Sequence, residues 1–98
     1  MQKSVADLRV EDFEPCTGKN FRLAAAGVAL ELKLIEVRRL GQAVREGGAF
    51  SLSFLSAPGP ILPQAIYPIE HPALGTLELF IVPLGPKKDG NSYEIIFT

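Results

Sequence analysis

The chain has 98 residues, of which 47% are apolar and 21% are charged, and its formal net charge is −1. This length fits one domain with a modest core, and the composition is that of a globular chain and not of a disordered one. The near-neutral charge gives no electrostatic reason to bind nucleic acid or an anionic membrane. The single cysteine, Cys16, cannot form an internal disulfide and is consistent with a reducing compartment.

The N-terminal fifteen residues contain no apolar stretch of signal-peptide length. The residues from Leu23 to Leu30 are apolar and uncharged, but this stretch is far too short to cross a bilayer. These features predict a cytoplasmic protein. They leave open that the chain becomes part of an assembled particle.

Residues 1–16 are predicted to form a short helical segment. Ser4 is a candidate N-cap, and Val5, Leu8 and Phe13 supply the apolar positions of a helical turn. Pro15 helps to end this segment. The rest of the single domain, residues 19–98, is predicted to form a β-barrel or sandwich.

Residues 28–40 fit two patterns. Leu30, Leu32 and Leu34 alternate with polar neighbours, as in a strand with one buried side. Helical spacing also aligns Leu30 with Leu34 and Val37, and many residues here are good helix formers. The strict alternation and the strands expected on both sides favour a strand. In this strand a β-bulge near Leu34 and Ile35 would turn Ile35 and Val37 toward the same core.

The other apolar runs are typical of short strands separated by turns that contain Gly and Pro, at residues 19–25, 49–56, 64–70, 76–84 and 92–98. The last two are predicted to form an antiparallel hairpin whose second arm closes the sheet. The predicted fold is therefore all-β, a small antiparallel barrel or sandwich of about six strands with a short N-terminal helix. Its shared core is predicted to contain Phe50, Leu52, Leu79, Ile81, Ile95 and Phe97.

The run at residues 76–84 is apolar on both faces. Leu79 and Ile81 lie on the face predicted to be inward, and Phe80 and Val82 lie on the other. A strand of this kind is normally covered on both sides. The candidate covers for the second face are the N-terminal helix, a second copy of the chain and a different protein. We expect the helix to cover it in part and to leave a patch that supports a homodimer, which would use this face or an exposed strand edge beside it.

The sequence offers little for catalysis or metal binding. His71 is the only histidine and Cys16 the only cysteine, which is fewer than a zinc site needs, and no G-x-S-x-G elbow occurs. Neither a Walker A nor a G-x-G-x-x-G pattern is present. We therefore expect no catalytic residues, no cofactor, no bound metal, no nucleic-acid partner and no membrane partner.

Several segments together resemble a family of small uncharacterised bacterial domains. They are "DFEPCTGKNFRL", "FSLSFLS", "LPQAIYPIEHPALGTLELFIVPLG" and "YEIIF", which span Asp12 to Phe97. The shared pattern is D-F, Q-x-x-Y, H-P-x-L-G, L-F-x-V-P and Y-E-x-x-F. The resemblance implies no catalytic residues. Some members are similar to accessory proteins linked to phage-tail-like components, which implies a structural role.

Two functions are compatible with these observations. The first is a non-enzymatic structural or protein-interaction module, an accessory component of a phage-tail-like assembly, that acts through Phe80 and Val82. The second is a small-molecule-binding barrel or minor enzyme with a site near Tyr67, His71 and Glu94. Gln64 would join these residues in a shared polar network.

Overall fold

The computed structural model describes residues 8–25, 27–41, 48–59 and 61–97. A single helical turn, α1 (Val10–Phe13), continues into a short 3-10 turn, η2 (Glu14–Cys16). Six strands follow: β1 (Asn20–Ala25), β2 (Val28–Gly41), β3 (Ala49–Ser56), β4 (Ala65–His71), β5 (Gly75–Lys87) and β6 (Gly90–Phe97). No helix among the described residues is long and apolar enough to span a membrane.

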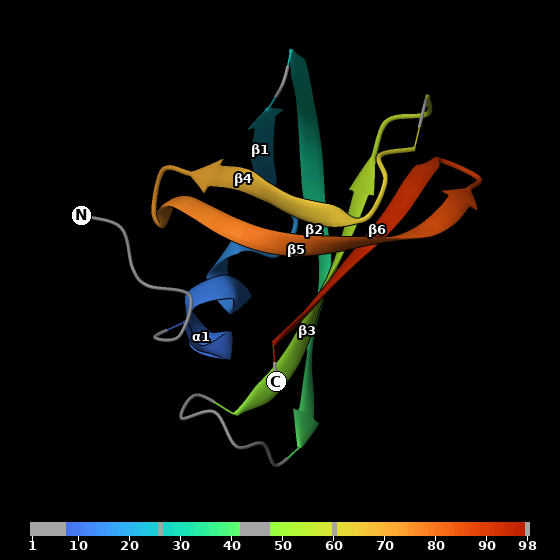
Figure 1. The fold of residues 1–98 in the computed structure, drawn as a ribbon. Coiled ribbons are helices and arrows are strands. Elements are labelled where there is room, and N and C mark those ends of the chain that lie inside the picture. Colours follow the sequence, from blue (N-terminus) through green and yellow to red (C-terminus); the bar gives the residue numbers. More distant parts are fainter. Residues whose placement is uncertain (1–7, 26, 42–47, 60, 98) are drawn as a thin grey trace.

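The strands form one antiparallel sheet that closes on itself. Their order is β1-β2-β3-β6-β5-β4, and β4 pairs again with β1 (Figure 1). Because side chains alternate along a strand, every strand presents one set of residues to the inside of the ring and the other set to the outside. The predicted all-β fold, with about six strands and a short N-terminal helix, is confirmed.

The ambiguous segment at residues 28–40 is a strand, within β2. Its pairing with β3 shifts between Leu34 and Glu36, so the predicted β-bulge is present and Ile35 is the extra residue. Leu34 is buried and Val37 packs against the core, whereas Ile35 is 47% exposed. The prediction that Ile35 also turns inward is therefore wrong, because a bulge leaves its extra residue outside the regular alternation.

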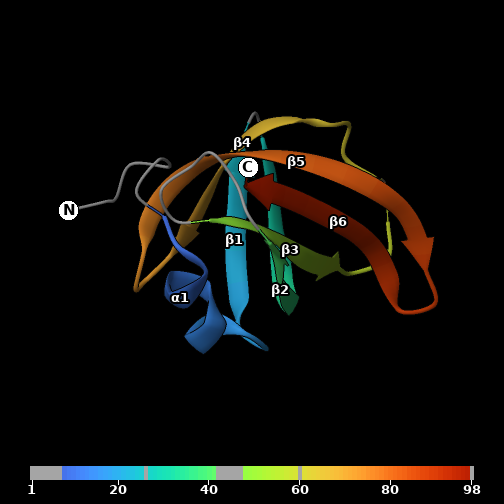
Figure 2. The same cartoon turned by 90° about the horizontal axis from the view of Figure 1, so that it is seen from below.

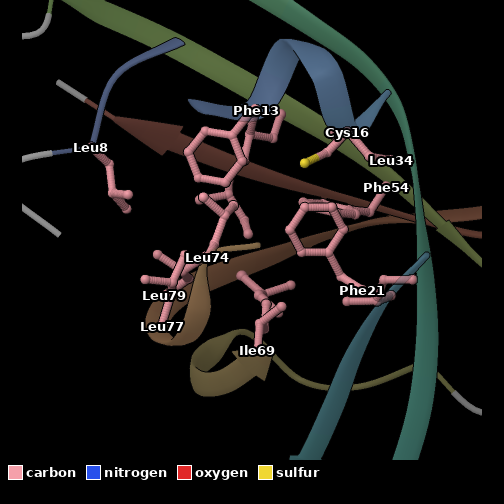
Figure 3. Packing of buried hydrophobic residues seen from close by; sticks show 14 of the residues in the cluster. Leu8, Phe13, Cys16, Phe21, Leu34, Phe54, Ile69, Leu74, Leu77 and Leu79 are labelled. Atoms are coloured by element: carbon pink, nitrogen blue, oxygen red, sulfur yellow. The ribbon is translucent and has the colours of Figure 1, made fainter. Parts of the chain in front are cut away.

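The helical turn closes one end of the core (Figure 2). Phe13 is fully buried, and its ring centroid lies 5.8 Å from that of Phe50 and 5.7 Å from that of Phe97. Figure 3 shows Phe13, Leu8 and Cys16 pointing into the same interior as the strand residues. α1 ends two residues before Pro15, which lies within η2, and the helical segment ends one residue later at Cys16. The predicted Ser4 cap and Val5 lie outside the described residues.

All six predicted core residues belong to the buried cluster. β6 pairs with β5 through a tight turn after Lys87, as predicted for the terminal hairpin. On its other side β6 pairs with β3, where Phe50 and Phe97 are direct partners and their rings stack at 4.4 Å. β6 thus lies between β3 and β5 in the ring and connects them.

Phe97→Ala is expected to lower the free energy of unfolding by about 3–5 kcal/mol, because it removes a buried ring that contacts two others. Ile96→Ala is the matched control, since Ile96 is the neighbouring residue and is 51% exposed. Denaturant unfolding followed by circular dichroism measures both. Equal midpoints for Phe97→Ala and the wild type would show that the end of β6 does not support the core.

Candidate functional site

The outer face of β4 and β5 carries exposed apolar side chains. The turn between these strands sets their register, because His71 pairs with Gly75 and this places Ile66 opposite Phe80. Ile66 is 64% exposed and Phe80 is 49% exposed, while Val82 is half-buried. We call Ile66, Phe80 and Val82 the outer patch. Cross-strand apolar partners of this kind are normally buried against something.

The helical turn does not cover the outer patch. Phe13 packs among Phe21, Phe50 and Phe97, whose side chains point into the ring, whereas Phe80 points out of it. The expectation that the N-terminal helix shields this face in part is therefore not met by residues 8–16. The two-sided apolar pattern of β5 consists of one core face and one exposed face.

A groove lies next to the outer patch and is created by two β-bulges. Leu34, Phe54, Tyr93 and Pro83 pair in one row across β2, β3, β6 and β5. On the two outermost strands of this row, the next residue along the chain is the extra residue of a bulge: Ile35 in β2, and Leu84 in β5.

Each bulge turns a large apolar side chain outward. Ile35 is 47% exposed and Leu84 is 52% exposed, and both line a surface groove of about 590 Å³ over β3 and β6. Ser53 and Ser92 also line the groove, and Lys87, Lys88 and Asp89 lie at the β5–β6 turn.

The four residues of the expected polar site are not brought together. The hydroxyl of Tyr67 donates to the carbonyl oxygen of Pro63 at 2.7 Å. Glu94 lies two strands away on β6, opposite Val82. Gln64 is exposed just before β4. No hydrogen bond within the described residues joins any two of the four, so the shared polar network is not formed there.

His71 lies at the other end of β4 and helps to line a pocket of about 450 Å³. Its ring packs on Phe21 with centroids 4.7 Å apart, and its Nδ1 accepts a hydrogen bond from the Ala73 backbone N–H at 3.0 Å. Arg22 lines the same pocket, with its Nε 4.0 Å from the carboxylate of Glu70. The pocket is therefore polar at its rim and aromatic at its base.

Cys16 is almost completely buried, at 4% exposure, and its Sγ lies 3.8 Å from the Asp12 carbonyl oxygen, to which it donates. Burial raises the pKa of this thiol above its usual value of 9.0, while Lys19 lowers it and Asp12 raises it further. A buried, protonated thiol is a poor nucleophile. Within the described residues, no cluster of three or more His, Cys, Asp or Glu side chains is placed to hold a metal ion.

The chain matches a family model described as a domain of unknown function (DUF6916), over residues 8–97. It belongs to this family. The expected membership in a family of small uncharacterised domains is confirmed to this extent. No curated protein and no solved structure matches the chain.

Sequence patterns identified only some of the exposed apolar residues of the outer patch and the groove. Phe80 and Val82 were expected on an interaction face, but Ile66 and Leu84 were not. The predicted turn at His71–Gly75 already implies that Ile66 faces Phe80, so this partner was available from the sequence. Leu84 depends on the bulge after Pro83, for which the alternation in the sequence gives no signal.

We expect the Cys16 thiol to react with an alkylating reagent at pH 8 at least about a hundredfold more slowly in the native chain than in denaturant. Because the folded pKa is raised, folding favours the protonated thiol. The contribution of the thiol to the free energy of unfolding is therefore fully present at neutral pH and decreases as the pH rises above about 9. Mass spectrometry of the labelled protein measures the rate. Rapid labelling without denaturant would contradict the buried placement.

Proposed function

We propose that this protein is a non-enzymatic protein-interaction module and that the outer patch is its binding surface. The observation that carries the proposal is the pair Ile66 and Phe80, which are direct cross-strand partners and are both about half exposed or more. Large apolar side chains that remain exposed together on a small domain mark interaction surfaces more often than isolated ones do.

The two candidate reactive side chains, Cys16 and His71, are better explained by structural roles than by catalysis, which favours a binding role for the protein. The Cys16 thiol lies in the core, and the His71 ring nitrogen Nδ1 is occupied by a backbone N–H in a turn. Each of these groups has a structural task where it stands. The outer patch, by contrast, is largely exposed and contributes little to the core. A bound partner would account for its apolar character.

The partner assembly that we propose to test first is a phage-tail-like particle. The support is the resemblance of the chain to small domains linked to such components. A compact sheet with a rigid apolar outer face suits an accessory structural role, because a preformed surface loses little entropy on binding.

Phe80→Glu is expected to weaken partner binding about thirtyfold or more, as for the loss of a central hot-spot residue. Leu40→Glu is the matched control, because Leu40 is 43% exposed on β2 and belongs to neither the outer patch nor the groove. Affinity capture from cells that encode the protein compares the wild type with both variants. The retained protein is then purified, and its affinity for each of the three chains is measured.

The expected result is one protein retained by the wild type and Leu40→Glu and lost by Phe80→Glu. A component of a tail-like particle would support the proposed assembly. Equal retention by all three chains would contradict the role of the outer patch. Circular dichroism confirms that each variant is folded.

A second candidate function is the binding of a small polar molecule in the His71 pocket. The observation that favours it is the pocket of about 450 Å³ that places the His71 ring beside Arg22 and Glu70. Of the residues expected for this site, only His71 lines the pocket, since Tyr67 and Glu94 lie elsewhere.

A thermal-shift screen with small polar metabolites tests this second candidate. A true ligand is expected to raise the Tm of the wild type and of Glu94→Gln, but not of His71→Ala. Ligand binding that survives His71→Ala would place the site elsewhere. A Tm that no compound raises would remove the support for this candidate.

A further inference from the structure

The outer side of β5 carries an ordered series of side chains along its length. Glu78 is exposed near the start of the strand, Phe80 and Val82 follow, and Leu84 and Lys87 are exposed toward its end. Figure 2 shows β5 as one long, curved strand that forms part of the ring. We call this series the β5 stripe. It is apolar in its centre, acidic at one end and basic at the other.

The two charges are placed evenly about Val82. Glu78 lies four residues before Val82. On the other side, Val82 pairs with Glu94 and Lys87 pairs with Gly90, so four ladder positions separate Val82 from Lys87 as well, because Leu84 is the extra residue of the bulge. Each charge is thus about 13 Å from Val82 along the strand.

This spacing makes the stripe complementary to itself. Rotation by 180° about an axis through Val82 and across the strand turns the stripe end for end. It therefore lays Glu78 of one copy against Lys87 of the other, twice in one dimer. The same rotation lays Phe80 of each copy against the exposed Leu84 of the other. A two-fold interface of this kind uses one surface on both subunits.

Neither Glu78 nor Lys87 has a charged partner within the described part of the chain. Lys88 and Asp89, which follow in the turn, have opposite charges and leave Lys87 as the net charge at this end. The charge that opposes association is Glu94, which lies beside Val82 on β6 and would face its own copy near the axis.

We propose that the partner of the outer patch is a second copy of this chain, bound across a two-fold axis at Val82 with Glu78 opposite Lys87. This inference rests on the proposed interaction function and names the partner. β5 pairs with β4 over residues 75–81 and with β6 over residues 82–87. The groups that carry the proposed contact are outward side chains, so in this proposal the copies associate through side chains and not by strand addition.

Complementary charge reversals test the two-fold directly. Glu78→Lys alone and Lys87→Glu alone each place like charges together twice, and each is expected to weaken dimerisation about tenfold or more. An equal mixture of the two variants restores opposite charges at both contacts, so it is expected to form heterodimers with nearly wild-type affinity. Lys33→Glu, an exposed charge reversal on β2, is the matched control and should leave dimerisation unchanged.

Light scattering and sedimentation equilibrium over a range of concentrations measure the association. A dimeric wild type that is lost in Phe80→Glu, together with recovery in the mixture, supports the proposal. Glu94→Gln should tighten the dimer, because it removes the repulsion at the axis. A wild type that stays monomeric at high concentration, or a mixture no more dimeric than its parts, overturns the two-fold. The capture experiment judges the interaction function separately, since it detects any protein that depends on Phe80.

Discussion

The packing of Phe13 against the stacked pair of Phe50 and Phe97 is the interaction on which the rest of the structure depends. These three rings bring together the helical turn, an early strand and the last strand. A small closed sheet has room inside for one layer of large side chains, and each strand contributes its inward-facing residues to that layer. Because this interior is filled by the inward residues and the helical turn, the outward residues have no place in the core.

That limit explains both the exposed outer patch and the groove. A one-residue bulge lets a strand keep its inward residues in phase while the ring curves, and the extra residue is left outside. Ile35 and Leu84 are left out in this way, one on each side of the β3–β6 pair, and Leu40 is left out at a second bulge of β2. They are large and apolar, so the bulges that close the ring also shape a surface on which another protein can pack.

Much of the fold could be predicted from the sequence because period-two alternation and turn residues are local signals. They identified all six strands, the bulge near Leu34 and the core around Phe97. The exposure of Ile35, and whether the helical turn covers the outward Phe80, could not be predicted in the same way. Whether an apolar residue beyond the first set is buried depends on how much volume the closed ring encloses, and this is a property of all strands together. The polar residues show the same limit, since His71 and Glu94 are set apart by strand order.

The arrangement of backbone pairing decides how an assembly can use this surface. β1 and β4 pair only through Arg22 with Glu70 and Leu23 with Ile69, so β4 has an unpaired edge before Ile69 within the described residues. Pro68 lies in this edge and has no N–H to donate, which makes it a poor template for an added strand. The proposed association therefore uses the outer face of β5, where the side chains carry the specificity. A surface of this kind favours a defined contact between folded domains over open-ended strand pairing, because register is set by the positions of a few apolar and charged groups.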